Sequence, residues 1–265
     1  MNKLMMGRYF SGDSFLHQLD PRTKLFATLY IIALLFFVEN IWGFLLLFAV
    51  TFFIMHQTGI ALVAFINGVK PLIWLILFAV MLRIFFTGGG IVYFRAGPVM
   101  LSSFGLITGF YTFSRFVLMI FISTVLTLTT KPIDLTDAIH ALLKPLQIFR
   151  ISINDFALML SISLRFIPNL LDETTKIVDA QRARGVVFGK GNIIQQMKKL
   201  VPIVLPLFAS SLKRAEELAD VMEVKGYQSD QKRTRYRQLK WQVRDAVALL
   251  MIVLLTAAVV FVNRL

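Results

Sequence analysis

Few side chains in this 265-residue sequence stand at the spacing that catalysis or metal binding requires. The three histidines, His17, His56 and His140, lie far apart along the chain and offer no metal-ligand pattern. The chain has no cysteine, which excludes a zinc–thiolate site and a thiol nucleophile. Its acidic residues are mostly interleaved with Lys and Arg, as on solvated helix faces. We therefore expect no catalytic residue and no metal site.

The segment from Gly185 to Gly191 has a partial likeness to a phosphate-binding loop. It has three residues between Gly185 and Gly189 instead of the four that the loop requires, and Lys190 is followed by Gly191 instead of Ser or Thr. The segment also follows a predicted helix, whereas a phosphate-binding loop follows a strand. The chain is therefore expected to bind no ATP and to need no cofactor.

Two other cation–glycine pairs stand at the ends of predicted helices. Ala183-Arg184-Gly185 and Val224-Lys225-Gly226 place their cations 41 positions apart (225 − 184). A glycine after the last turn adopts the left-handed conformation without penalty, and the cation meets the negative end of the helix dipole. Taken singly, each triplet is an ordinary helix end. Two similar ends on two similar helices predict two similar sockets on partner proteins.

The helices that carry these triplets lie in a charged segment, Lys131 to Arg244, with 19 basic and 11 acidic residues. Apolar residues recur in it at helical spacing. A short amphipathic helix is predicted from Ile133 to about Leu143, with Asp134 as its N-cap and Asp137 in its first turn.

Two long helices follow this short one. The first begins at Asn154 or Asp155, bends at Pro168 and ends at Gly185. The second begins near Asn192 and ends at Gly226, and its two prolines are expected to break it, at Pro202 and Pro206. The segment is therefore predicted to be helical and not a disordered tail.

The remainder of the sequence has the composition of a membrane protein. The chain is 57% hydrophobic and 16% charged with a mean hydropathy of +0.72, whereas soluble domains are about 45–50% apolar and about 25% charged. The predicted fold is an all-α polytopic integral membrane protein, with a transmembrane region over residues 1–130, a cytoplasmic helical domain over 131–244 and a last span over 245–265. About five spans are expected from the uncharged runs: Leu25–Val38, Ile41–Met55, Pro71 to Phe94 around Arg83, Ser102–Thr130 and Ala246–Asn263.

Orientation follows from the basic residues, because loops rich in Lys and Arg stay in the cytoplasm. With the N-terminus inside, 24 of the 28 basic residues fall in cytoplasmic segments. We therefore expect a multi-pass protein of the cell membrane, with its N-terminus and the charged segment in the cytoplasm. We therefore attribute the net charge of +13 to membrane orientation and to contacts with protein partners. Nucleic acid is not expected as a partner, because the long apolar runs leave no polar scaffold for a basic groove.

Arg115 interrupts the fourth expected span and has two interpretations. Deep in the bilayer it would need a partner and would be a functional candidate. If the helix begins near Phe113, the side chain instead reaches the outer interface, and the length of Phe116–Thr130 favours this second interpretation. No acidic residue interrupts any span, which weakens the case for a proton- or sodium-coupled transporter.

Three ordered motifs resemble a known family over essentially the whole chain. They are the run Ser14 to Leu25 with Asp20-Pro21-Arg22-Thr23-Lys24 inside it, the Leu164-Arg165-Phe166-Ile167-Pro168 bend that leads to Ala183-Arg184-Gly185, and Met222-Glu223-Val224-Lys225-Gly226-Tyr227. Together they look like the transmembrane T component of energy-coupling factor transporters.

The resemblance implies a non-catalytic scaffold with two kinds of protein partner: two cytoplasmic ATP-binding subunits, and a membrane S component, one or several, that captures a vitamin or another micronutrient. Its long coupling helices would dock on the ATPases through Ala183, Arg184 and Gly185 at one end and Val224, Lys225 and Gly226 at the other. Lys225 keeps the charge of an arginine but lacks the planar five-donor fork. Pro168, Pro202 and Pro206 would bend the coupling helices.

Two other functions stay open from the residues alone. A permease subunit of an ABC transporter with its own translocation path would need polar residues facing a pore, and these are scarce in the spans. A stand-alone secondary transporter would move its solute without ATPases. An integral membrane enzyme is disfavoured because His, Asp and Glu do not cluster in the sequence.

Overall fold

The computed structural model describes residues 9–10, 12, 14–96, 99–143, 153–228 and 241–264. The chain forms two compact units, and each is described here by itself. The first unit consists of Met1–Leu142 together with Leu239–Leu265, and the second of Leu143–Gln238. Helices dominate both units over the described residues, which confirms the all-α fold class.

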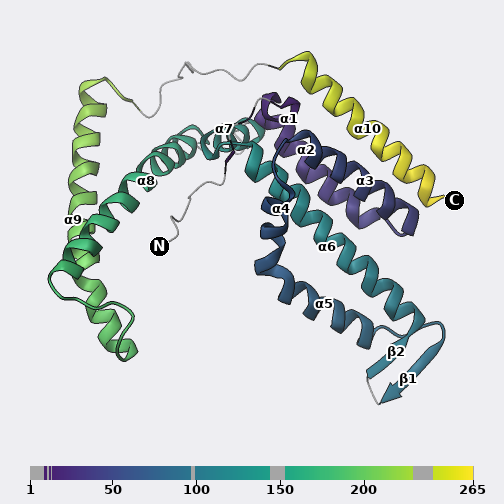
Figure 1. Cartoon of the computed structure of the whole chain (residues 1–265). Coiled ribbons are helices and arrows are strands. Elements are labelled where there is room, and N and C mark those ends of the chain that lie inside the picture. Colours follow the sequence, from purple (N-terminus) through teal and green to yellow (C-terminus); the bar gives the residue numbers. More distant parts are fainter. Residues whose placement is uncertain are drawn as a thin grey trace. The chain divides into compact units, whose positions relative to one another are not determined.

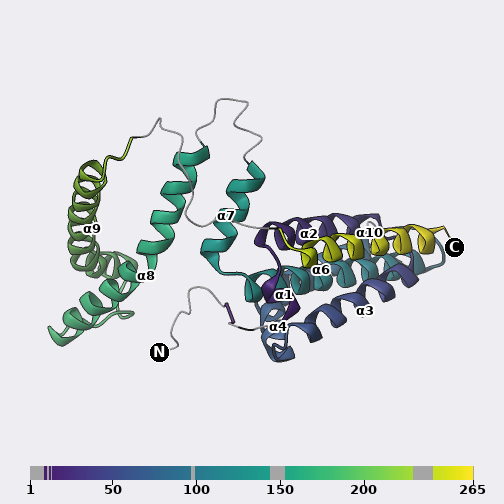
Figure 2. The same cartoon turned by 90° about the horizontal axis from the view of Figure 1, so that it is seen from above.

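The first unit is a helical bundle with a small β-hairpin at one end, between α5 and α6 (Figure 1). Its elements are α1 (Phe15–Gln18), α2 (Pro21–Leu34), the 3₁₀ turn η1 (Leu35–Phe37), α3 (Ile41–Gln57), α4 (Leu62–Val69), the 3₁₀ turn η2 (Lys70–Leu72), α5 (Ile73–Phe86), β1 (Val92–Ala96), β2 (Val99–Ser102), α6 (Ser103–Thr129), α7 (Pro132–Leu143) and α10 (Val243–Asn263). Helices α2, α3, α6 and α10 lie side by side in both cartoon views, so α10 closes the bundle against α2 and α3 (Figure 2).

Three helical segments among the described residues are long and apolar enough to cross a bilayer: Leu62–Phe86, Ser103–Thr129 and Val243–Asn263. Helix α3 is apolar but shorter, and α2 continues through η1 to Phe37. The described part of the chain is therefore that of a polytopic membrane protein. The count of five spans and the boundaries of the three expected regions stay predictions.

The third expected span differs from the helix that the structure has. The segment begins at Leu62, earlier than Pro71, and ends at Phe86. Beyond it, β1 pairs antiparallel with β2, so Val92–Phe94 are strand residues. Two glycines with positive φ, Gly89 at 138° and Gly90 at 67°, separate the helix from β1, and they adopt this conformation without a Cβ penalty. The β-branched and aromatic residues that follow favour a strand.

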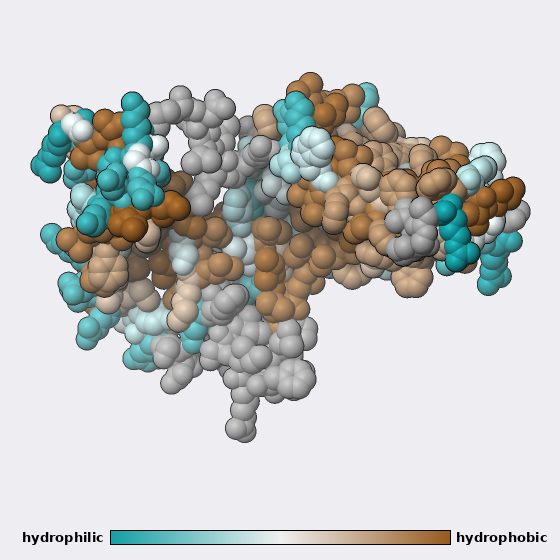
Figure 3. All heavy atoms as spheres, turned by 90° about the horizontal axis from the view of Figure 1, so that it is seen from below, coloured by the Kyte–Doolittle hydropathy of each residue, from teal (hydrophilic) through white to brown (hydrophobic). Residues whose placement is uncertain are grey.

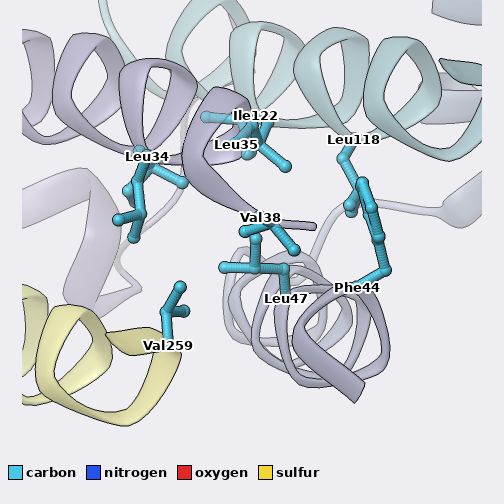
Figure 4. Close-up of a cluster of buried hydrophobic side chains, with 9 residues drawn as sticks. Leu34, Leu35, Val38, Phe44, Leu47, Leu118, Ile122 and Val259 are labelled. Carbon is cyan, nitrogen blue, oxygen red and sulfur yellow. The ribbon is translucent and has the colours of Figure 1, made fainter. Parts of the chain in front are cut away.

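A cluster of buried apolar side chains holds the first unit together (Figure 4). Leu35, the first residue of η1, and Val38, the residue that follows η1, are fully buried among side chains of α2, α3, α6 and α10. The other members are Ile31, Leu34, Phe44, Leu47, Leu118, Ile122 and Val259. Many large apolar side chains are nevertheless exposed, among them Trp74 at 80%. In the space-filling view brown residues cover most of this bundle, as expected for a surface in contact with lipid (Figure 3).

The second unit contains α8 (Ile153–Ala183) and α9 (Ile193–Val224). The predicted start near Asn192 is confirmed, and the Asn192 side chain accepts a hydrogen bond from the Ile193 amide. The predicted break at Pro202 and Pro206 is wrong, because α9 is one helix through both prolines. The prolines stand four residues apart, so they leave only the carbonyls of Lys198 and Pro202 without their helical donors. The bends at the prolines stay predictions.

The short helix α7 also begins differently from the prediction. Its first residue is Pro132, and Asp134 lies inside the first turn and is not the N-cap. Proline is favoured at the first helical position because its missing N–H would have no intrahelical acceptor there. Asp134 still faces the positive end of the helix dipole, so the prediction identified the right residue for the helix start and gave it the wrong position.

Candidate functional site

The two basic triplets end α8 and α9 with the same hydrogen-bond pattern. At the end of α8, the Val186 amide donates to Gln181 O at 3.1 Å and the Gly185 amide to Arg182 O at 2.9 Å. At the end of α9, the Tyr227 amide donates to Met222 O at 2.9 Å and the Gly226 amide to Glu223 O at 2.8 Å. Each bond in one helix is the bond in the other shifted by 41 positions. We call these two ends, Ala183–Gly185 and Val224–Gly226, the tips.

The tips present positive charge on small, open backbone. All six tip residues are exposed, Val224 at 88%. Gly185 has a φ of 88° and Gly226 a φ of 72°, and a Cβ added at either would meet nothing within 4 Å. The glycines are therefore required by backbone conformation and not by crowding within this chain. A surface that approaches a tip would meet one cation and an uncovered glycine.

A second exposed surface lies along α9. Its apolar side chains recur at helical spacing and point to solvent, with exposed fractions from 51% to 69%. We call it the α9 apolar face, made of Ile194, Met197, Val201, Val204, Leu205, Phe208 and Leu212. Ile203, on the opposite side of the helix, is the buried residue that the structure describes in α9. A soluble helix does not expose such a stripe without a partner.

Sequence reasoning missed a buried polar junction between α2, α6 and α10, formed by Asp20, Lys24 and Asp245 with the Thr129 carbonyl. Lys24 Nζ donates to Thr129 O at 3.0 Å and to His17 O at 3.1 Å. The Asp20 amide donates to Asp245 Oδ1 at 2.8 Å. Asp245 is only 1% exposed, and Asp20 and Lys24 are 7% and 8% exposed. The Asp-Pro-Arg-Thr-Lys run, part of the first motif of the family resemblance, thus also joins the start of α2 to α6 and α10.

Local hydrogen bonds at helix starts orient the two acids of this junction. Asp20 caps α2 by accepting from the Arg22 amide at 2.8 Å. Asp245 and Gln242 form a capping box at the start of α10, where Asp245 Oδ2 accepts from the Gln242 amide at 2.9 Å. An acid at the first turn of the last apolar run, immediately after a basic cluster, is the sequence signal that would have identified Asp245.

Lys24 precedes the first expected span. Burial lowers the pKa of its ammonium to about 8, against the raising effect of Asp134, Asp20 and Asp245. The side chain therefore stays protonated at neutral pH, and three carboxylates compensate its charge. A buried cation held in this way depends on every partner, because removing one leaves the others without compensation.

Arg115 lies in α6, twelve residues after Ser103 (115 − 103), so the expected helix start near Phe113 is wrong. Its Nε donates to Leu35 O at 3.0 Å and its Nη2 to Val38 O at 3.1 Å. The guanidinium carbon also lies 5.5 Å from the centroid of the Phe36 ring. Arg115 thus closes the free carbonyl end of η1 and holds the first helical segment against α6.

Replacing Arg115 by leucine is expected to lower the free energy of unfolding by about 2 kcal/mol, because two buried carbonyls lose a charged donor. Arg115→Lys should retain part of this stability, since one ammonium can reach one carbonyl but not both in the arginine geometry. Thermal unfolding of the purified chain in detergent measures the difference. The matched control is Arg83→Leu, at an exposed arginine of α5; an equal loss there would contradict the structural role of Arg115.

Neither catalysis nor metal binding gains support from the described residues. No group of three or more His, Asp or Glu side chains in the described ranges could hold a metal ion. The segment Gly185–Gly191 follows helix α8, and Lys199 Nζ donates to Val187 O and Lys190 O at 2.8 Å each. These bonds tie the connection between α8 and α9 to α9 itself, which is a structural use of its backbone.

An apolar helical bundle, two long helices with matched basic tips and an exposed apolar face together indicate a polytopic membrane protein. The family described as "Cobalt transport protein" (CbiQ) matches residues 12–236. The energy-coupling factor transporter transmembrane protein EcfT 1 of Listeria monocytogenes is 53% identical over 263 residues, 99% of each chain. EcfT of Lacticaseibacillus paracasei is 52% identical over 94% of each chain, and that of Bacillus subtilis 41% over 99% of each.

The chain belongs to the CbiQ family and is a transmembrane T component of energy-coupling factor transporters. It is therefore a membrane protein and one part of a larger transporter complex. The family predicted from the three motifs is confirmed.

Proposed function

We propose that this chain couples ATP hydrolysis by two cytoplasmic ATP-binding subunits to the uptake of a micronutrient, which a separate S component captures in the membrane. The chain itself catalyses no reaction and transmits motion. The observation that carries the proposal is the pair of tips, which repeat the same hydrogen bonds at the ends of two helices. Two tips with the same backbone pattern fit two similar ATPase sockets.

Each tip would enter its socket through the cation and the adjacent glycine. Arg184 and Lys225 can donate charge-assisted hydrogen bonds to acidic side chains or carbonyls of the socket, and such bonds are stronger than neutral ones. Gly185 and Gly226 let the socket backbone approach closely, because no Cβ covers the helix end. This assignment orients the protein in the plasma membrane with α8, α9 and the N-terminus on the cytoplasmic side, as the distribution of basic residues predicts.

The α9 apolar face is proposed as the surface that contacts the S component. Its residues are exposed in this chain, and their Ile, Leu, Val, Met and Phe side chains suit contact with an apolar membrane protein. The tips and the face belong to the same helix pair, so a movement of the tips reaches the face through rigid helix. The identity of the cargo would follow from the S component and not from this chain.

Placing a charge on the α9 apolar face should separate the two kinds of partner. Val201→Glu is expected to reduce retention of the S component at least about tenfold, because a carboxylate would be desolvated in the contact. Both ATPases should stay bound, since the tips are unchanged. Quantitative co-purification with a tagged chain measures both. Gln195→Glu, an exposed polar position on another side of α9, is the matched control, and equal loss of the S component in it would contradict the assignment.

The proposed function as a whole is tested by reconstitution. The chain, both ATPases and an S component are placed in liposomes, and cargo uptake is followed with and without ATP. Uptake should require ATP and all four proteins. Uptake by the chain alone, without ATPases, would instead identify a stand-alone transporter, and uptake with the ATPases but no S component would identify a permease with its own path.

A further inference from the structure

Helices α8 and α9 cross each other in Figure 1 and pack against one another, and one ion pair between described residues joins them. Arg214 Nη2 of α9 donates to Glu173 Oε2 of α8 at 2.6 Å. The other two ion pairs between described residues, Arg182–Asp179 and Lys213–Glu217, each lie within one helix. The side chains of these two pairs are 44–77% exposed, whereas the Glu173 side chain is 22% exposed and the Arg214 side chain 36%. The Glu173–Arg214 pair is therefore the charged contact between the two helices.

The ion pair joins residues that are equivalent in the two helices. The tips are related by a shift of 41 positions, as Arg184 and Lys225 are (225 − 184), and Glu173 and Arg214 differ by the same 41 positions (214 − 173). Each residue of the pair stands eleven positions before its own tip cation (184 − 173 and 225 − 214). At a rise of about 1.5 Å per residue, each arm from the pair to its tip is about 16 Å long.

A contact between equivalent residues has a geometric meaning. When two copies of a unit are related by a two-fold axis, a residue touches its own counterpart only where the axis passes. Helices α8 and α9 are not identical, but their tips follow the same backbone pattern and their crossing contact follows the same shift. The Glu173–Arg214 contact thus lies at the centre of an approximate two-fold arrangement of the arms.

We propose that the Glu173–Arg214 ion pair is the pivot of the coupling helices, a fixed point about which the two arms turn when the tips move. Equal arms turn by equal amounts, so a symmetric movement of two ATPases becomes one rotation of the helix pair. Without a fixed point the helices can slide along each other, and part of the tip movement is lost before it reaches the α9 apolar face. Glu173 and Arg214 are positioning residues in this scheme and touch neither ATP nor cargo.

The pivot rests on the proposed function, and a charge exchange tests it in the reconstituted complex. Glu173→Arg, which sets two arginines against each other, should lower the number of cargo molecules imported per ATP at least about tenfold while both ATPases stay bound. Combining it with Arg214→Glu restores an ion pair of opposite direction and should bring the ratio back. The matched control is Lys213→Glu, which breaks the exposed Lys213–Glu217 pair within α9 and should leave the ratio unchanged.

A cross-link provides the second measurement, because the natural chain has no cysteine. Glu173→Cys with Arg214→Cys removes the ion pair and should couple poorly. A short bifunctional maleimide that joins the two cysteines should then raise uptake per ATP, since it re-establishes a fixed point, whereas a monofunctional maleimide on the same variant should not.

The outcomes separate the pivot from the function on which it rests. If both ATPases stay bound and neither the charge exchange nor the cross-link restores uptake per ATP, the pivot is overturned and the proposed function stands. If the unaltered chain does not retain the ATPases, the proposed function is overturned and the pivot with it. Restoration in both experiments supports the pivot, because a purely structural ion pair would not make the import ratio depend on a covalent substitute.

Discussion

Reversing the charge of both tips, Arg184→Glu with Lys225→Glu, is expected to abolish co-purification of the two ATPases and ATP-dependent uptake. Each cation can make charge-assisted hydrogen bonds worth about 1.5–3 kcal/mol, which is roughly tenfold or more in affinity per tip. Reversal replaces this attraction by repulsion in the same socket. The tips are exposed and keep their backbone hydrogen bonds, so the chain itself should fold normally.

The single variants and a matched control sharpen this result. Arg184→Glu should weaken docking more than Lys225→Glu, because guanidinium offers a planar fork and ammonium a point charge. Lys176→Glu with Lys198→Glu makes the same change in net charge at exposed positions away from the tips and should leave docking intact. If the tip double variant retains both ATPases and its uptake is unchanged, the assignment of the tips as ATPase-docking sites is contradicted.

Replacing Lys24 by methionine is expected to destabilise the first unit more than any other single substitution considered. The ammonium interacts electrostatically with the carboxylates of Asp134, Asp20 and Asp245 and donates to the carbonyls of His17 and Thr129. Removing one partner of a buried charge cluster costs about 3–5 kcal/mol because the remaining charges lose their compensation. At roughly 2–4 °C per kcal/mol, this corresponds to a fall in Tm of about 6–20 °C.

Thermal unfolding in detergent measures this fall, and two further variants locate its cause. Lys131→Met removes an exposed lysine from the neighbouring turn and should change Tm little. Asp245→Asn should destabilise the unaltered chain but recover part of the loss in Lys24→Met, because it removes one uncompensated charge. Additive effects of Lys24→Met and Asp245→Asn would contradict a shared junction.

The buried junction gives a structural role to both the acid and the lysine of the motif near the N-terminus. The Asp20 side chain caps α2, and the Asp20 amide donates a hydrogen bond to Asp245. Lys24 donates a hydrogen bond to the Thr129 carbonyl in the last turn of α6. The three helices that meet here are far apart in sequence. Without this junction, mainly apolar contacts would hold the start of α10 to α2. In lipid, the burial of apolar groups gives little driving force for helix association.

Local sequence determined the class of the protein and the ends of its long helices. Composition and uncharged runs suffice for an all-α membrane protein, because a bilayer demands helices whose backbone groups are satisfied internally. Asn192 at the start of α9, and Gly185 and Gly226 after the helix ends, act through hydrogen bonds to residues at most five positions away. Caps and C-terminal glycines are therefore readable from spacing.

Tertiary structure alone decided which distant residues meet. Asp20 and Asp245 are 225 positions apart, and Arg115 lies 80 positions from the carbonyl of Leu35 that it binds. No periodicity relates such positions, and a charge in an apolar run has the same local pattern whether it binds a carbonyl or reaches solvent. The packing of α8 against α9 also brought Glu173 to Arg214. The shift of 41 positions relates these two residues, but it does not by itself say that they touch. Sequence spacing encodes what one helix does by itself, whereas pairing across helices depends on how they pack.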